Sequence, residues 1–402
     1  MRKIHRAIAL IALFFGLYVA ATGTLIQLVD LRSILGHAPP NDPDMQAIRD
    51  GRDGPPNFQV LQDADFAAQP LPDGFDFDQA LARLGGVAAA SAAAPMSYIE
   101  WRMVDGRPVA QEAVGGRLLR FDALGGEALN DAQSAPPARL PPAGNRASLR
   151  NTLKNIHRMT AWGDLATIAF FVLGLALFAM IATGLTLYYQ LWRSRARLRR
   201  PAPFWSAGGA WRSLHRACAV GASVLLGWVA FTGLLCAIGS LGVALYRHQT
   251  NGVRPGLTMD MSSPLPADLL PPMLRTTLTA YHAAAGSEPI KVLRLRTFAG
   301  MQQGVVVYGH PDTRQLAFNA STGARARLTE AGYPRTGQTF GWQGDQLLKA
   351  LHRGDFMGMA GRWLSLLTGC ALLFMSASGA VLYFSGRKTF SGRTTRKPIN
   401  AG

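Results

Sequence analysis

Four histidines form two matched pairs in this 402-residue sequence. His5 and His215 are each followed by Arg and, 17 positions after the histidine, by Thr-Gly; His157 and His352 are each followed by Arg and, after 26 positions, by Thr-Gly or Ser-Gly. Neutral imidazole is a common ligand of iron and other transition metals. Two imidazoles that face each other at one depth of a helix bundle suit the axial positions of a haem iron. We therefore predict two haem sites, one from His5 and His215 and one from His157 and His352.

Other residues near these histidines favour haem over a bare metal ion. Zinc is disfavoured because neither pair has a third and a fourth ligand beside it. Without a Cys-x-x-Cys-His motif, the expected group is haem b, bound non-covalently. A guanidinium pairs well with a carboxylate, so the arginine after each histidine is a candidate partner for a haem propionate. These arginines are Arg6, Arg216, Arg158 and Arg353. Met180 and Met375, at equivalent positions, are the alternative axial ligands.

A stripe of small residues follows His5 at helical spacing. Its members are Ala9, Ala12 and Gly16, and Ala219 and Ala222 follow His215 in the same way. Such a stripe leaves room for a flat macrocycle. It is equally typical of two helices that pack closely, and the sequence leaves both interpretations open.

The elements that carry the histidines are predicted to lie in a membrane, because 49% of the residues are hydrophobic and only 16% are charged. A helix of about 20 apolar residues crosses the hydrocarbon core. Four stretches reach this length: Ile8 to Val29, Leu165 to Leu187, Ala217 to Leu245 and Trp363 to Phe384. The three cysteines all fall within apolar stretches, which excludes a disulfide framework.

The net charge of +17 is concentrated in three blocks, 1–6, 189–216 and 386–402, which contain 15 Lys or Arg and no acidic residue. Each block borders an apolar stretch, as the positive-inside rule predicts, so the charge indicates membrane lipid as its neighbour and not nucleic acid. Both termini are then cytoplasmic. The predicted division is helix 1–29, outside domain 30–156, helix 157–188, cytoplasmic loop 189–214, helix 215–245, outside domain 246–351, helix 352–385 and cytoplasmic tail 386–402.

Both outside segments contain patterns typical of strands. The first has Ser97 to Val104 and Gly116 to Asp122, and the second has Lys291 to Arg296, Gly304 to Tyr308 and Phe318 to Ala320. We expect each segment to be a small α+β domain. Residues 38–58 and 131–147, rich in Pro, Asp and Ala, are predicted to be loops or linkers.

The spacing of the motifs indicates a tandem duplication. Thr183-Gly184 and Ser378-Gly379 align without a gap when His157 is placed on His352. Each repeat consists of a span, an outside domain and a second span, so both repeats have the same orientation in the membrane. The predicted fold is a four-helix membrane protein with two periplasmic α+β domains.

The chain resembles the PepSY-associated transmembrane family in its four His-Arg motifs, in the Thr-Gly near the far end of a span, and in Arg120 to Ala128 and Ala317 to Gly323. Within that family it is similar to inner-membrane dihaem proteins that reduce ferric siderophores. The resemblance implies two b-type haems held by histidines among four spans, and electron transfer to a ferric chelate in the periplasm. Because the sequence has neither a G-x-G-x-x-G fingerprint after a strand nor a Walker A motif, a separate cytoplasmic or quinol donor is expected.

Two other classes of function remain open. The outside domains could bind peptides, which would make the chain a sensor or regulator without redox activity. A transporter built from parallel repeats is less favoured, because no ionisable residue lies near the centre of a span.

Overall fold

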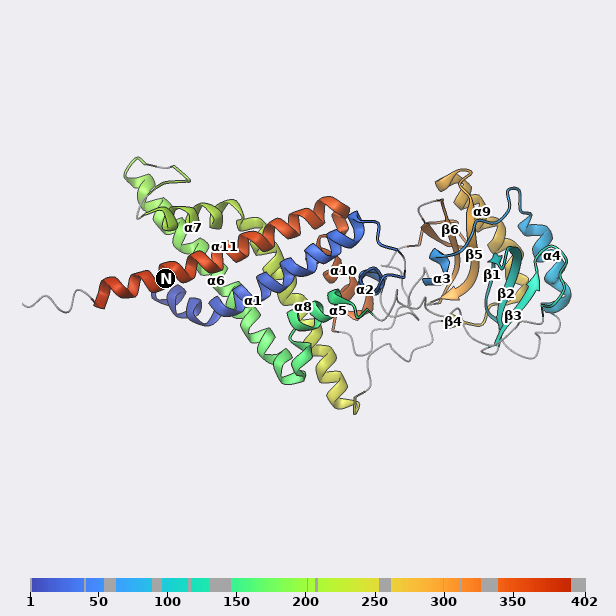
Figure 1. The fold of residues 1–402 in the computed structure, drawn as a ribbon, viewed down its shortest axis with the longest axis horizontal. Helices are drawn as coiled ribbons and strands as arrows, with labels where there is room; N and C mark the ends of the chain where they lie inside the picture. The colour runs from blue at the N-terminus through green and yellow to red at the C-terminus, as the bar shows by residue number, and fades with distance from the viewer. Residues whose placement is uncertain are drawn as a thin grey trace, which may run out of the picture.

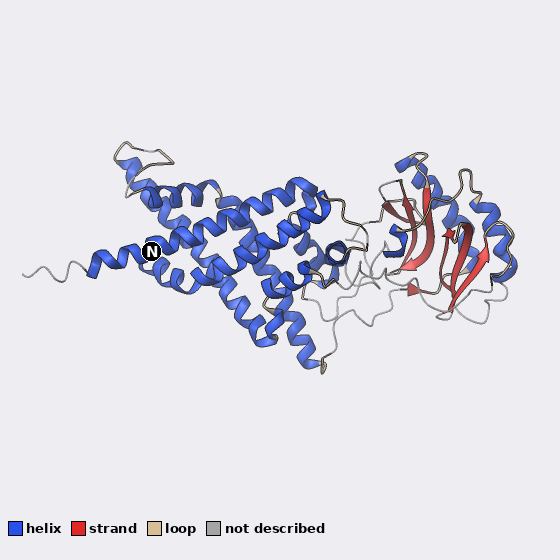
Figure 2. Cartoon of the chain, viewed as in Figure 1, coloured by secondary structure: helices blue, strands red, loops and turns tan. Residues whose placement is uncertain are grey.

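The computed structural model describes residues 2–39, 41–53, 63–88, 96–114, 117–129, 146–200, 202–206, 209–252, 262–298, 300–310, 313–326 and 339–391. It contains a bundle of long helices and, at one end of that bundle, an antiparallel sheet with its own helices (Figures 1 and 2). The N-terminus lies at the end of the bundle that is far from the sheet. The predicted tail 386–402 is described only to residue 391, within a helix, and 131–145 of the second predicted linker lie outside the described residues.

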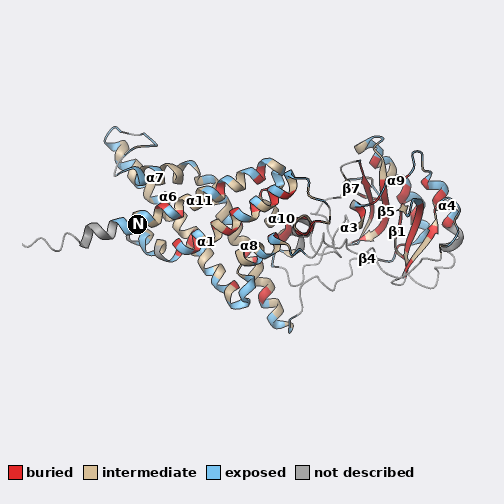
Figure 3. Ribbon diagram, in the orientation of Figure 1, coloured by how far each residue is buried: buried red, intermediate tan, exposed pale blue. Residues whose placement is uncertain are grey.

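Four helices in the described residues are long and apolar enough to cross a membrane. They are α1 (Arg2–Leu35), α6 (Asp164–Arg197), α8 (Ser223–Gln249) and α11 (Gly358–Ser391). Each packs against two others, in the order α1, α6, α8, α11 and back to α1. Large apolar side chains on these helices, such as Phe14, Leu165 and Val224, are exposed. Exposed residues recur along the long helices (Figure 3). Apolar residues on both the inside and the outside of a bundle are typical of helices surrounded by lipid.

Short helices lie against the ends of the long ones. At the end near the sheet are α2 (Pro43–Asp53), α5 (Leu149–His157) and α10 (Gly341–Arg353) (Figure 1). At the other end, α7 (Ala210–Gly221) precedes α8 and is separated from it by a break at Ala222. The prediction that 38–58 is an unstructured linker is therefore wrong for its central part, which forms α2.

The sheet has seven strands: β1 (Met96–Val104), β2 (Arg107–Val114), β3 (Arg117–Asp122), β4 (Ser262–Ser263), β5 (Ile290–Phe298), β6 (Met301–Tyr308) and β7 (Arg314–Asn319). Their order is β3-β2-β1-β5-β6-β7, and β4 pairs with β5. Strands from both predicted outside domains thus join in one sheet, at the antiparallel pair β1 and β5. The strand β2 was not predicted; it lies between the two predicted strands of the first segment and pairs with both.

One face of the sheet is covered by α4 (Phe77–Ala88) and α9 (Leu270–Ala285), which bury a core centred on Trp101. The other face carries buried charges in the middle of the sheet. Arg294 of β5 donates from Nε to Glu100 of β1 at 2.7 Å and from Nη2 to Asp65 of α3 (Asp63–Phe66) at 3.1 Å. Because Glu100 and Arg294 are directly opposite in the register, this ion pair lies where the two segments meet.

Candidate functional site

Each of the four predicted histidines is held by the hydroxyl of a Thr or Ser on a neighbouring helix. Nδ1 of His5 lies 3.0 Å from Oγ1 of Thr183, and Nδ1 of His157 lies 2.8 Å from Oγ1 of Thr22. In the second half of the chain, the same distances are 2.7 Å for His215 and Ser378 and 3.2 Å for His352 and Thr232. The Thr-Gly and Ser-Gly motifs that the sequence showed only as markers of a repeat are therefore the holders of the histidines.

The direction of these hydrogen bonds follows from a second bond that each hydroxyl makes. The hydroxyl proton goes to a backbone carbonyl one turn earlier in all four cases: Thr22 to Tyr18, Thr183 to Ala179, Thr232 to Trp228 and Ser378 to Phe374, over 2.6 to 2.8 Å. A hydroxyl has one proton, so the imidazole must donate from Nδ1 to the hydroxyl oxygen. This assigns the tautomer with the proton on Nδ1 and leaves the lone pair of Nε2 available to a metal.

The glycine after each hydroxyl makes room for the ring. A Cβ at Gly233 would lie 3.0 Å from Cε1 of His352, and at Gly23 or Gly184 it would lie 3.3 Å from Cε1 of the histidine held there. At Gly379 the corresponding distance is 3.7 Å, which is an ordinary contact. A side chain in three of these four positions would push the imidazole away from its hydroxyl.

The four histidines lie in two layers. We call His157, His352, Thr22 and Thr232 the sheet-end layer, and His5, His215, Thr183 and Ser378 the N-terminal layer. In the sheet-end layer the ring centres of His157 and His352 are 6.5 Å apart and the ring planes are 35° from parallel. In the N-terminal layer, burial and, after it, the charge of the neighbouring His5 lower the pKa of His215. The sequence-based pairing therefore matches the neighbours that the structure brings together.

The sequence predicted that His157 and His352 begin spanning helices, but the structure places them elsewhere. They end the short helices α5 and α10, and the chain then reverses through left-handed residues, Met159 (φ 57°) in one case and Gly354 (φ 83°) in the other. A bond from α1 or α8 fixes each short helix: the Tyr18 hydroxyl donates to the carbonyl of Ile156, and Trp228 Nε1 donates to the carbonyl of Leu351 at 3.2 Å.

This reversal places the sheet-end layer at the depth of Thr22 in α1. The 17 residues between His5 and Thr22 correspond to roughly 26 Å of helix axis. An unbroken helix from His157 to Thr183 would have separated the layers by roughly 39 Å. The folded-back histidines are thus well inside the bundle and closer to the N-terminal layer than the sequence implied.

Burial keeps the imidazoles neutral. Burial lowers the pKa of His157 to about 3, and it also lowers the pKa of His352 to about 4. The pKa of His215 is lowered to about 4, again mainly by burial. A neutral ring keeps the nitrogen lone pair that a metal needs.

The geometry of the sheet-end layer fits two axial ligands of one haem iron. Metal–imidazole bonds of about 2 Å on opposite sides of an ion place the two ring centres roughly 6 Å apart, close to the 6.5 Å between His157 and His352. Among the residues that the structure describes, no group of three or more His, Cys, Asp or Glu could hold a metal ion. The pair His157 and His352 supplies two nitrogen ligands, the number that a haem iron would accept from a protein.

The arginines next to the histidines have different surroundings. Arg6 is exposed. Arg216 stacks on Trp205, 4.9 Å from its ring centre, and donates to the backbone carbonyl of that residue. Arg158 donates to the Ser240 hydroxyl at 2.9 Å, and Arg353 pairs with Asp355 at 2.7 Å. Of these four arginines, Arg353 is therefore paired with a carboxylate, whereas Arg158 is half-buried and donates to a neutral hydroxyl.

The small-residue stripe after His5 supports close helix packing at Gly16. A Cβ there would lie 3.1 Å from the hydroxyl of Ser376 on α11 and 3.4 Å from Leu177 on α6. Ala12 is fully buried. The other four histidines of the chain, His37, His248, His282 and His310, are exposed, as expected of surface residues.

Comparisons with known proteins agree with the resemblance seen in the sequence. Residues 2–386 match the model of a family described as the PepSY-associated TM region. A search of curated proteins found no match.

Proposed function

Because the chain belongs to the PepSY-associated transmembrane family, we propose that it is a haem-b electron-transfer protein of the bacterial inner membrane that reduces the ferric iron of siderophores on the periplasmic side. The observation that carries this proposal is the repeated unit of histidine, hydroxyl and glycine. Four imidazoles in two layers have Nδ1 bound and Nε2 available. A hydrogen bond from the ring nitrogen that does not bind the metal orients a metal-binding imidazole and raises its basicity.

Two haems are proposed. His5 and His215 would hold one, and His157 and His352 would hold the other. When bound, haem supplies one-electron chemistry at its iron, at a potential that the axial ligands and their surroundings set. The chain's own residues orient the rings through the hydroxyls of Thr22, Thr183, Thr232 and Ser378.

The internal symmetry of the chain supports a tandem duplication. Strands β1, β2 and β3 have 9, 8 and 6 residues, and β5, β6 and β7 have the same lengths in the same order. Tyr18 and Trp228, at equivalent positions, donate to the carbonyls just before the two equivalent histidines. The duplication explains why two sites with two matched ligands each arise in one chain.

The charge distribution supports an orientation with the sheet in the periplasm. The basic blocks border the helix ends that are far from the sheet, and positive charge favours the cytoplasmic side. A donor would then deliver electrons near the N-terminal layer, and the ferric chelate would meet the sheet end. Reporter fusions after Gly144 and after Gly208 should report opposite sides of the membrane; the same side for both would contradict this topology.

The substrate in this proposal is iron in a siderophore, held as Fe(III) by hard oxygen ligands. One electron converts it to Fe(II), which such ligands hold less tightly, so the metal is released. This step needs no acid, base or nucleophile from the protein.

An absorption spectrum of the detergent-purified protein tests the proposal. We expect a Soret band, α and β bands that appear on reduction, and about two haems per chain by pyridine extraction. A featureless visible spectrum from protein produced with ample haem would contradict the proposal and leave the sensor or regulator as the better interpretation. Re-oxidation of the reduced protein by a ferric siderophore, with a ferrous chelator to trap the product, tests whether the protein passes electrons to the siderophore iron.

A further inference from the structure

The two halves of the chain carry different charges at equivalent positions beside the sheet-end layer. Placing His5 on His215 brings Asp30 onto Ser240, and placing His157 on His352 brings Arg150 onto Asp345. Neither alignment needs a gap. One half thus has an acidic residue on the spanning helix, whereas the other has a neutral hydroxyl there.

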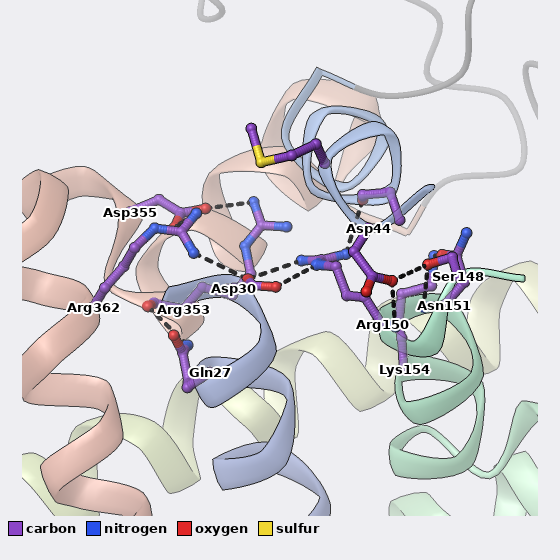
Figure 4. Close-up of polar contacts among 12 residues, drawn as sticks. Gln27, Asp30, Asp44, Ser148, Arg150, Asn151, Lys154, Arg353, Asp355 and Arg362 are labelled. Carbon is purple, nitrogen blue, oxygen red and sulfur yellow. Dashed lines mark hydrogen bonds and ion pairs between the residues drawn. The ribbon is translucent and has the colours of Figure 1, made fainter. Parts of the chain in front are cut away.

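Around Asp30, buried charges from both halves of the chain pair with one another (Figure 4). The carboxylate of Asp30 accepts from Nε of Arg150 at 2.6 Å and from Nη1 of Arg362 at 3.0 Å. Asp355 pairs with Arg362 at 2.8 Å and with Arg353 at 2.7 Å. Each carboxylate bridges two guanidiniums, which is the arrangement that makes buried charge tolerable.

Around Ser240, which takes the position of Asp30, the charges are not closed into pairs in the same way. Arg158 donates to Ser240, a neutral partner. Asp345 is buried against α8, where a Cβ at Gly239 would lie 3.1 Å from its Oδ1. In the part of the chain that the structure describes, neither Asp345 nor Lys349 makes a hydrogen bond or an ion pair.

The pKa values agree with incomplete pairing. Burial, followed by the charge of Arg158, lowers the pKa of Lys349 to about 8. Burial also raises the pKa of Asp345. In a closed ion pair, the pKa of the cation would be raised and the pKa of the anion would be lowered.

We propose that Arg158 and Lys349 form a binding site, beside Ser240, for a carboxylate of a ligand, which takes the place that the Asp30 carboxylate has in the other half. A guanidinium and an ammonium at one place match a carboxylate. Ser240 donates its proton to the carbonyl of Cys236 at 3.0 Å and accepts from Arg158, so it orients the guanidinium. The site directly follows His157, so the bound carboxylate lies beside the sheet-end layer. Two sources have this chemistry: a propionate of the haem, which rests on the proposed function, and a carboxylate of an external chelate such as ferric citrate.

Matched variants separate the site from general effects of charge. Lys349→Gln removes the ammonium, and Lys154→Gln makes the same change at the equivalent position of the first half. Ser240→Asp introduces the carboxylate that the other half already has, and Ser240→Asn controls for its size without the charge. The full-length protein is measured in two ways: the rate of haem loss from each spectral component to an excess of a haem-binding acceptor, and the thermal shift produced by citrate and by ferric citrate.

A propionate in the site predicts that Lys349→Gln and Ser240→Asp accelerate haem loss from the sheet-end component by about tenfold or more, since a bond to a buried charge is removed. Lys154→Gln should leave that rate within about twofold of the original, and Ser240→Asn should change it less than Ser240→Asp does. An external carboxylate predicts instead that citrate or ferric citrate raises the unfolding temperature of the original protein and of Lys154→Gln, but not of Lys349→Gln or Ser240→Asp. If neither haem loss nor the citrate shift responds to Lys349→Gln and Ser240→Asp, the proposal is overturned. A preparation without haem contradicts the proposed function alone, because the citrate measurement still tests the site.

Discussion

The two histidine layers use the same hydrogen-bonded unit on different scaffolds. In the N-terminal layer, His5 lies on the long helix α1 and His215 on α7, and both rings are half-buried. In the sheet-end layer, the histidines end short helices that fold back into the bundle, and they too are half-buried. The hydroxyl and the glycine therefore set the geometry of the ligand in both layers, whereas the scaffold sets the depth of the ring in the bundle.

The largest effect is expected from the ion pairs that fix the sheet-end scaffold. Asp30 binds Arg150 of α5 and Arg362 of α11, so Asp30→Ala leaves two buried guanidiniums without their shared partner. Removing one member of a buried pair typically costs about 3–5 kcal/mol. We expect thermal unfolding of the detergent-solubilised protein to show a loss of this size, with the sheet-end haem component lost before the other.

Ser240→Ala serves as the control for thermal stability: it changes the equivalent position without removing a carboxylate, so a much smaller loss is expected. Equal loss of both haem components in Asp30→Ala would mean that the cluster stabilises the bundle as a whole and not the sheet-end layer.

The next largest effect is expected at the hydroxyls. Thr22→Val and Thr232→Val keep the shape of the side chain but remove the oxygen that accepts from Nδ1 of His157 and His352. Loss of such a partner typically weakens metal binding by 10- to 100-fold, roughly. Haem titration should show this weakening in the sheet-end component only, and Thr→Ser at the same positions should restore binding.

The same experiment on Thr183→Val and Ser378→Ala should affect only the N-terminal component. A variant in one layer that weakens the other layer equally would break the division of the histidines into two sites.

The smallest effect is expected at the glycines, and it should be graded. Gly233→Ala places a Cβ 3.0 Å from Cε1 of His352, whereas Gly379→Ala places one 3.7 Å from Cε1 of His215. Overpacking costs about 1–3 kcal/mol, so the first variant should lose stability and shift its haem band, and the second should be close to the original protein. Similar results for the two variants would show that the ring moves freely and that the contact does not position it.

The sequence was sufficient to predict the elements that follow from local pattern. The four apolar stretches correspond to long helices, and the matched spacing of His157 and His352 anticipated that their rings are neighbours. Strand β2 escaped prediction because Pro108 and the pair Gln111 and Glu112 interrupt the apolar alternation that marks a strand.

Tertiary contacts decided the rest. Thr22 lies on the same helix as His5 but holds His157, and nothing in the spacing along one helix indicates a partner on another. The reversal after His157 depends on Met159 in a left-handed conformation, which a residue other than Gly rarely adopts. The single sheet depends on pairing between strands almost 200 residues apart, such as Glu100 with Arg294.

The most direct test of the central claim is a reductive titration of four single variants, each with one histidine replaced by Ala. We predict that His157→Ala and His352→Ala affect the same spectral component, which is either lost or converted to high spin. His5→Ala and His215→Ala should affect the other component in the same way. Reduction by a cytoplasmic donor should then fail in His5→Ala and His215→Ala, whereas reduction of an external ferric chelate should fail in His157→Ala and His352→Ala. If His5→Ala and His157→Ala lose the same component, the two-layer assignment is wrong, and Met180 and Met375 become the ligands to test.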